Sequence, residues 1–316
     1  MTFRPNFRPT TIATMLLLTS SLALTACGGG DDEPQDVSRA DVMAARTERG
    51  QAAAQEVAQG QRQQAEAAGP VSQAITAWVP KVTDTWQWQL TGTINTSYNV
   101  KVYDIDLFDA PDSVISTLHS QGKYVVCYFS AGSAENWRPD YNQFKAADLG
   151  NPLDGWKGEK WVDTRSANVR NIMKGRLDKA KSRGCDGVEP DNVDAYTNKP
   201  GFPLTATTQL DYNRFLATEA HARGLKVGLK NDVDQLKALE PSFDFAVNEQ
   251  CNQYNECGGY SVFTSKGKPV FNAEYKKLWR DDANERAKMC TKAKSMNLRT
   301  LVLPLALNDA FRYSCD

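Results

Sequence analysis

The sequence contains very little histidine. Only His119 and His221 occur among 316 residues, and each lies in a segment whose pattern predicts a helix. We expect both to lie on a helix surface or in helix packing. A Ser-His-Asp triad needs a histidine in a catalytic position and a histidine-rich zinc site needs several, so two histidines in predicted helices argue against both.

The sequence also lacks a large net charge and closely spaced cysteine pairs of the metal-binding type. The formal net charge is −1 at pH 7, whereas nucleic-acid-binding proteins usually carry a basic surplus. No CxxC pair and no cofactor motif occur, so we expect neither a metal site nor a cofactor.

Apart from Cys27, the cysteines form an even set, which predicts disulfides in an exported chain. The predicted pairs are Cys251–Cys257 across a short loop, Cys127–Cys185 and Cys290–Cys315.

Residues 1–26 are typical of an export signal. Arg4 and Arg8 precede an apolar stretch, residues 11–24, that is too short for an ordinary membrane span, and no later segment is apolar enough. The following Leu-Thr-Ala-Cys27 resembles the lipobox of bacterial lipoproteins, which implies cleavage before Cys27 and a lipid on its sulfur. We therefore expect an exported protein anchored to a bacterial membrane, with Gly28 favouring the outer membrane. The alternative is ordinary secretion.

A low-complexity spacer follows the signal. Residues 27–77 are rich in Ala, Gln, Glu and Arg and hold few large apolar side chains. Helix propensity is good there, but little surface is available to bury, so tertiary packing cannot stabilise a helix. We expect a partly helical or disordered tether.

Residues 78–316 alternate short apolar runs with amphipathic helical patterns such as residues 166–184 and 208–224. The predicted strands are residues 85–90, 100–109, 123–132, 186–194, 225–232, 243–251, 268–275 and 300–307. Such alternation predicts parallel strands joined by crossover helices, and eight of them predict a (β/α)8 TIM barrel, expected to be monomeric. Residues 160–166 are surplus. They are either a strand-like excursion in a long third loop or a true barrel strand.

The stretch from Gly184 to Tyr196 carries the strongest chemical signal. A glycine that can end a helix precedes a short apolar strand, and four carboxylates occur within nine residues. In a barrel, the loops after the strands carry the active site, which places Asp191 in a catalytic position and Glu189 on the same strand face. So many carboxylates repel each other, and cationic neighbours, a metal, protonation or a cationic substrate must compensate them.

Other polar groups follow the remaining strands and converge on the same mouth. Strong acids from several strands, without histidine or a cofactor motif, favour hydrolysis by a pair of carboxyl groups. Aromatic rings supply flat surfaces for sugar binding. The predicted substrate-binding residues are Asp104, Asp106, Glu189, Asp194, Tyr196, Lys230, Asn231, Glu274, Tyr275, Trp88 and Trp137.

Seven ordered blocks, among them WQWQL, YDIDLFD, GCDGVEPDNVDAY and FAVNEQC, together resemble glycoside hydrolase family 114. This is the endo-α-1,4-polygalactosaminidase family, and the resemblance runs from about residue 78 to the end. It implies a (β/α)8 fold and retaining cleavage of α-1,4-linked galactosamine or N-acetylgalactosamine polymers. By matching motifs, it implies Asp191 as nucleophile and Glu249 as general acid/base, about 5–5.5 Å apart.

The acidic mouth agrees with this substrate class, because galactosamine carries an ammonium group near neutral pH. Asp104, Asp106, Asp194 and Glu274 are candidates for binding that group, or else they hydrogen-bond loop backbone and Lys230. We interpret Lys230 as a fixed counter-charge rather than a nucleophile. Asn231 is a candidate partner for a sugar hydroxyl.

Two other functions are compatible with the sequence. One is a carbohydrate-binding barrel at the cell surface that has lost turnover. The other is a metal-dependent hydrolase using Asp104, Asp106 and Asp191, which the lack of histidine ligands disfavours.

Overall fold

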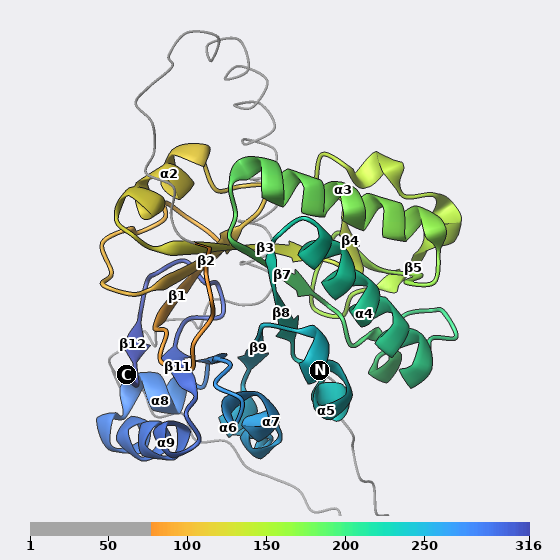
Figure 1. Cartoon of the computed structure of the whole chain (residues 1–316). Helices are drawn as coiled ribbons and strands as arrows, with labels where there is room; N and C mark the ends of the chain where they lie inside the picture. The colour runs from red at the N-terminus through yellow and green to blue at the C-terminus, as the bar shows by residue number, and fades with distance from the viewer. Residues whose placement is uncertain (1–76) are drawn as a thin grey trace, which may run out of the picture.

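The computed structural model describes residues 77–316, and its centre is a curled sheet of parallel strands (Figure 1). The strands run in the order β1-β2-β3-β7-β8-β9-β10-β11, with β12 at the edge. Their bounds are β1 Trp86–Gln89, β2 Val102–Asp106, β3 Tyr124–Ser130, β7 Gly187–Asp191, β8 Lys226–Lys230, β9 Phe245–Glu249, β10 Val270–Glu274, β11 Arg299–Val302 and β12 Tyr313–Ser314. The predicted TIM-barrel class is confirmed. Residues 303–307, predicted as strand, instead lie beyond the end of β11.

The seam of the barrel lies between β11 and β1. The short strand β12 pairs antiparallel with β11. The indole of Trp86 donates to the carbonyl of Arg299 over 2.8 Å, and the Arg312 guanidinium donates to the carbonyl of Trp86 over 3.0 Å. Near the mouth, the backbone N–H of Leu90 donates to the carbonyl of Leu307 over 3.0 Å. Side chains and the carboxyl-terminal segment thus join the two strands.

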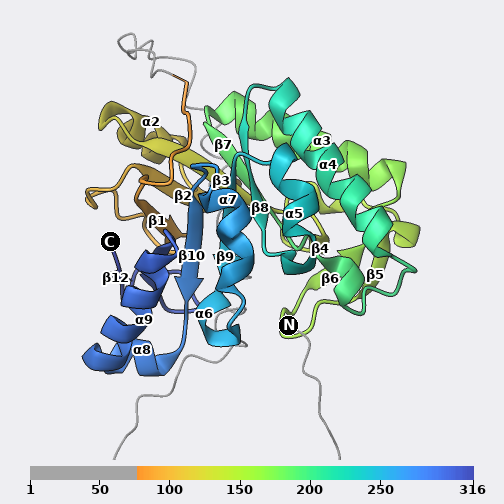
Figure 2. The ribbon, with the colours of Figure 1, turned by 60° about the horizontal axis from the view of Figure 1, so that its bottom comes forward.

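Helices cover the outer face of the sheet (Figures 1 and 2). Their bounds are α2 Asp112–Ser120, α3 Ala167–Arg183, α4 Ala206–Ala222, α5 Leu236–Leu239, α6 Cys251–Tyr254, α7 Ser261–Thr264, α8 Lys277–Asp281 and α9 Ala283–Ser295. The two long helices have local sequence causes. Ser166 caps the first turn of α3, and Gly184 at φ +85° ends it, a conformation that glycine adopts without strain. Thr205 forms a capping box for α4.

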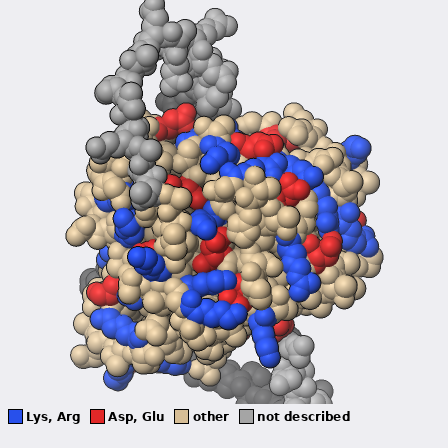
Figure 3. All heavy atoms as spheres, in the orientation of Figure 1, with Lys and Arg blue, Asp and Glu red and all other residues tan. Residues whose placement is uncertain are grey.

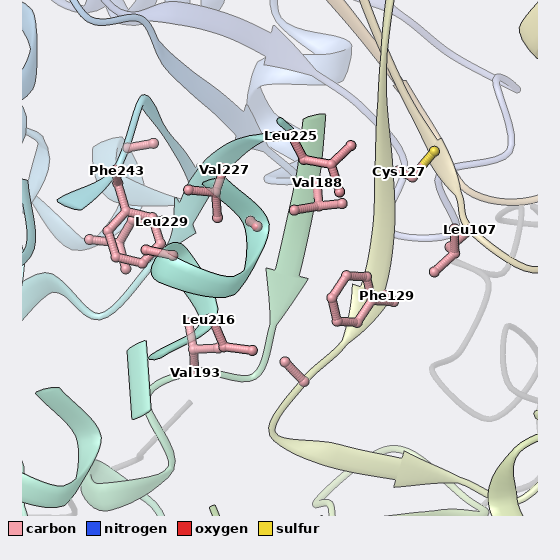
Figure 4. Packing of buried hydrophobic residues seen from close by; sticks show 14 of the residues in the cluster. Leu107, Cys127, Phe129, Val188, Val193, Leu216, Leu225, Val227, Leu229 and Phe243 are labelled. Atoms are coloured by element: carbon pink, nitrogen blue, oxygen red, sulfur yellow. The ribbon is translucent and has the colours of Figure 1, made fainter. Parts of the chain in front are cut away.

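Two apolar layers hold the barrel together. One lies between sheet and helices, where strand residues such as Val188 and Val227 contact helix residues such as Leu216 (Figure 4). The other fills the barrel interior with aromatic rings from facing strands, including Trp86 and Phe271, whose ring centroids are 5.0 Å apart. Each such buried side chain contributes roughly 1.5–3 kcal/mol to stability. The interior is therefore closed below the mouth.

The long third loop forms a small sheet of its own. Its strands are β4 Ser133–Glu135, β5 Leu149–Pro152 and β6 Glu159–Val162, in the antiparallel order β4-β6-β5. The surplus run at residues 160–166 is thus an excursion and not a barrel strand. Short 3₁₀ helices lie in this loop and in those after β7, β8 and β9. They are η1 Tyr141–Gln143, η2 Ala146–Asp148, η3 Ala195–Thr197, η4 Val233–Gln235, η5 Glu240–Ser242 and η6 Cys257–Tyr260.

All three predicted disulfides are present: Cys127–Cys185, Cys251–Cys257 and Cys290–Cys315. Both histidines lie in the last turns of helices and contact aspartates, His119 with Asp186 over 2.9 Å and His221 with Asp244 over 2.7 Å, which confirms their packing role. Among the described helices, none has the length and apolar character of a membrane span. The predicted signal, Cys27 and the tether up to residue 76 lie outside the described residues.

Candidate active site

Lys230, the last residue of β8, is the centre of a cluster of charged groups at the mouth. Its Nζ lies 2.8 Å from Glu189 Oε1, 3.1 Å from Asp191 Oδ1 and 3.4 Å from Glu249 Oε2. It also lies 4.7 Å from the centroid of the Trp88 ring. Burial lowers the pKa of Lys230, but the three carboxylates outweigh that effect and hold it well above its usual range. The predicted counter-charge role is supported. With a side chain only 2% exposed, Lys230 is not placed to bind substrate directly.

Asp191 ends β7 and faces the mouth, with 18% of its side chain exposed. Its Oδ1 accepts the backbone N–H of Asn192 over 2.7 Å, and its Oδ2 accepts the hydroxyl of Tyr128 over 3.1 Å. Asn192 has φ +60°, so the chain turns sharply after the acid. Lys230 is a third donor. These contacts fix both oxygens while leaving the group open to solvent.

Glu249 ends β9 and has 25% of its side chain exposed. The hydroxyl of Tyr275 donates to its Oε1 over 2.6 Å. Its backbone N–H donates to Oδ1 of Asn231 over 2.9 Å, and Gln250 follows at φ +66°. Tyr275 is therefore in the predicted site. Asn231, predicted as a partner for a sugar hydroxyl, uses its side-chain oxygen to position the backbone of Glu249.

Asp104 and Glu189 lie deeper in the barrel than predicted. Their side chains point inward from β2 and β7, and they are 1% and 0% exposed. The prediction that they bind substrate is wrong, because a sugar cannot reach them. Burial raises the pKa of Glu189 to about 7 although Lys230 acts in the opposite direction. Burial and the adjacent Glu189 raise the pKa of Asp104 well above its usual range.

Asp106 holds the third loop instead of substrate. Both of its oxygens accept from the guanidinium of Arg138, over 2.9 and 2.7 Å, and Arg138 also pairs with Glu135. Burial raises the pKa of Asp106, but Arg138 outweighs that effect and lowers it. The substrate-binding prediction is wrong here, because these oxygens are already used. Asp106 is likewise not available as the ligand that the metal-dependent alternative needs.

Glu274 faces out of the barrel, which corrects its predicted place in the mouth. Successive strand residues point to opposite faces, and its neighbour Ala273 packs in the interior. Its Oε1 accepts the backbone N–H of Asn252 over 2.8 Å, beside the disulfide loop. Within residues 77–316, the group with metal-ligand spacing is Glu274 with Cys251 and Cys257, and these two cysteines are joined in a disulfide.

The predicted aromatic residues divide into core and rim. Trp88 is 2% exposed and stacks on Trp86, so its predicted role as a sugar platform is wrong. Trp137 in the third loop and Tyr196 on η3 are partly exposed. Burial, with the charge of Asp232 nearby, raises the pKa of Tyr196 to about 12. Asp194 is also partly exposed, and burial followed by the charge of Asp191 raises its pKa to about 6.

Sequence reasoning missed three partners of the predicted acids. Tyr128 lies in the predicted strand 123–132, and the register of β3 and β7 sets it two residues before the partner of Asp191. Asn192 follows the acid directly and adopts φ +60°. Asparagine is enriched in that region, so an asparagine right after an acid at a strand end was a usable signal. Arg138 lies 32 residues from Asp106, and nothing in the sequence joins them.

On the face shown in Figure 3, Lys and Arg side chains are interspersed with Asp and Glu.

Comparisons with known proteins agree with this geometry. The crystal structure of Aspergillus fumigatus Ega3 in complex with galactosamine is 44% identical and has a TM-score of 0.71, covering 78% of this chain and 100% of that one. The glycoside hydrolase domain of PelA from Pseudomonas aeruginosa is 15% identical, with a TM-score of 0.55 and coverage of 73% and 97%, and is alike in fold. An uncharacterized protein of Deinococcus radiodurans is 25% identical over 230 residues, 65% of this chain and 74% of that protein.

The family itself is shown by a model match. The model of glycoside-hydrolase family GH114 matches residues 67–316, which is most of the sequence and includes every residue of the mouth. The 44% identity to Ega3 over the whole of that structure agrees with the match. The chain therefore belongs to glycoside hydrolase family GH114 and is a glycosidase.

Proposed function

We propose that the chain is a retaining endo-glycosidase that cleaves α-1,4-linked galactosamine and N-acetylgalactosamine polymers, with Asp191 as nucleophile and Glu249 as general acid/base. One observation carries the assignment. Both carboxylates are partly exposed at the mouth, and both contact the same ammonium nitrogen of Lys230, over 3.1 and 3.4 Å. The nearest oxygens, Asp191 Oδ1 and Glu249 Oε2, are therefore no further apart than the sum of those contacts. That limit accommodates a retaining pair, about 5–5.5 Å apart, and falls at the bottom of the roughly 6.5–9.5 Å range of inverting pairs.

The reaction needs two steps at this site. In the first, an oxygen of Asp191 attacks the anomeric carbon, the bond to the leaving oxygen breaks with its electron pair, and Glu249 gives that oxygen a proton. In the second, Glu249 takes a proton from water as the water attacks the same carbon and Asp191 leaves. Tyr128 and Asn192 orient the attacking carboxylate, and Tyr275 orients the acid/base.

Lys230 allows the two acids to work at short range. Two carboxylates this close repel each other unless a cation compensates them. A buried ammonium between them stabilises both positions and costs no reorganisation during the reaction. Because Glu189 holds the ammonium from below over 2.8 Å, Lys230 is fixed and does not act as a nucleophile.

The substrate class is supported by a relative and by the charge of the mouth. Ega3 was crystallised with galactosamine. In this chain Asp191, Glu249 and the partly exposed Asp194 give the mouth an acidic character, which attracts an ammonium-bearing sugar. The alternative of a binding barrel without turnover loses support, since both reacting carboxyl groups are present and open to solvent.

Product analysis tests the proposal. The purified chain is incubated with partially deacetylated α-1,4-galactosaminan and, as a control, with chitosan, and the products are measured by mass spectrometry. We expect oligomers from galactosaminan alone and none from the Asp191→Asn and Glu249→Gln variants. Full activity in both variants, or no products from folded wild-type protein, would refute the assignment.

We also propose that the chain is exported and anchored by a lipid on Cys27. The signal-like residues 1–26 support this, as do three disulfides in the described part of the chain, because disulfides persist in oxidising compartments.

A further inference from the structure

Two buried carboxyl groups below the mouth lack the partners that buried polar atoms require. Asp104 is 1% exposed, and neither of its oxygens has a hydrogen-bond donor. Glu189 is 0% exposed, and its Oε2 also lacks a donor, although its Oε1 accepts from Lys230 over 2.8 Å. Buried polar groups are almost always hydrogen-bonded, so three such oxygens in one place require an explanation.

The two acids are neighbours. Asp104 lies within hydrogen-bonding reach of Glu189. Both point into the barrel, because Asp104 pairs in register with Val126 and Glu189 with Tyr128, and these two partners pack in the interior. If both were ionised, two negative charges would face each other in a dry interior with no donor between them. A single proton on one of them turns that repulsion into an O–H···O bond.

We propose that Asp104 is a positioning residue that carries a proton and donates it in a hydrogen bond to Oε2 of Glu189. The proton belongs on Asp104 because Glu189 already accepts from a cation, Lys230, which favours its ionised form. Asp104 has no cation at hydrogen-bond distance among the described residues. This hydrogen bond supplies a donor to Oε2 of Glu189 and gives the Asp104 carboxyl a hydrogen-bond partner.

The consequence for catalysis rests on the proposed function. In this arrangement Glu189 is ionised and accepts a hydrogen bond from Asp104. It keeps Lys230 in place, and the ammonium of Lys230 contacts both Asp191 and Glu249. A second negative charge at Asp104 would draw the ammonium deeper and lengthen its contacts to the reacting pair. Asp104 therefore acts on the reaction through Glu189 and Lys230, without touching substrate.

Proton uptake gives a signature that a merely structural role lacks. An unfolded aspartate has a pKa of about 3.9, so a carboxyl that stays protonated in the fold binds a proton on folding. Its contribution to stability is full at pH below that value and is lost as pH rises toward the folded pKa. The titratable groups next to the acid pair are Lys230, Asp191, Tyr128 and Tyr275, and Glu249 contacts the same ammonium of Lys230.

The test compares Asp104→Asn with Asp104→Ala in the full chain. Asparagine places an N–H donor where the acid O–H stood and cannot titrate, whereas alanine removes the donor. We expect Ala to lower kcat on galactosaminan by about tenfold or more with a smaller change in KM, and Asn to restore most of that loss. We also measure unfolding equilibria between pH 5 and 8. As pH rises, the stability of the wild type relative to Asp104→Asn should fall, by up to about a tenfold change in the unfolding equilibrium constant per pH unit.

Two results would overturn the proposal. One is a wild-type-to-Asn stability difference that does not change with pH, which would show that Asp104 takes up no proton on folding. The other is an Asn variant as impaired in kcat as the Ala variant. The unfolding measurement needs no substrate and only the wild type and the Asn variant. Absence of galactosaminan cleavage by the wild type would therefore count against the proposed function alone, and poor folding of the Ala variant leaves the unfolding test decisive.

Discussion

Replacing Lys230 by methionine removes the one cation that contacts all three carboxylates of the site in the described chain. Glu189, which is fully buried, then loses its charge partner. Breaking a buried ion pair by removing one member costs about 3–5 kcal/mol of unfolding free energy. The fold can limit that cost by protonating Glu189, because burial already raises its pKa to about 7, compared with about 4.3 in an unfolded chain.

The sign of the pH dependence follows. A carboxyl whose pKa is raised in the folded state binds a proton more readily there, so its folded state is favoured at low pH and loses stability as pH rises. We therefore expect Lys230→Met to be less destabilised at pH 5 than at pH 8. Asp191 and Glu249 also lose their shared cation and repel each other, so kcat/KM should fall by about a hundredfold, which is about 2.7 kcal/mol of activation free energy.

A matched control lies on the same strand. Lys226 begins β8, is about one-third exposed, and contacts Asp244 over 3.1 Å. Lys226→Met should cost no more than about 1 kcal/mol and leave kcat/KM unchanged. Denaturant unfolding at pH 5, 7 and 8 and initial rates on galactosaminan decide the matter. A Lys230→Met variant as stable and as active as wild type would refute the role given to Lys230.

Three further predictions follow from the contacts. Tyr275→Phe removes the hydroxyl that donates to Glu249 over 2.6 Å, so kcat should fall about tenfold with the fold intact, measured by initial rates and circular dichroism. Arg138→Met leaves buried Asp106 without its cation and should lower the unfolding free energy by about 3–5 kcal/mol in denaturant titrations. Cys27→Ser should abolish incorporation of labelled fatty acid and release the protein from membranes, measured by fractionation.

Each of these has its own control and contradicting result. Tyr254→Phe alters an exposed tyrosine and should leave kcat unchanged, and equal losses in both tyrosine variants would contradict the first prediction. Arg165→Met removes an exposed pair with Asp163 and should cost under about 1 kcal/mol, so a similar cost for Arg138→Met would contradict the second. Continued labelling of the Cys27→Ser protein would contradict the third.

The sequence predicts the architecture well because its strand and helix signals are local. Gly184 after an amphipathic stretch and the apolar run before Asp191 need only neighbouring residues to be interpreted, and both are confirmed. The three disulfides are likewise confirmed. Strand ends were less accurate, because residues 303–307 are apolar enough for a strand but follow the end of β11.

The site was predicted less completely, for two physical reasons. The first is the alternation of strand faces. Glu274 and Tyr275 are adjacent, so they do not share a face, and only Tyr275 reaches Glu249. The second is depth. Asp104 points into the barrel, but the stagger of the strands places it below the mouth. Apolar side chains pack around the interior at that depth and exclude substrate.

The most direct test of the catalytic pair is the configuration of the first sugar released. α-1,4-Galactosaminan is mixed with the enzyme in an NMR tube, and the anomeric protons are recorded before mutarotation equilibrates the reducing ends. Asp191 attacks from the face opposite the leaving oxygen, and water then attacks from the face that this oxygen vacated, so the account predicts the α-anomer first. The β-anomer first would mean inversion by a single displacement and would contradict both the covalent step and the roles given to Asp191 and Glu249.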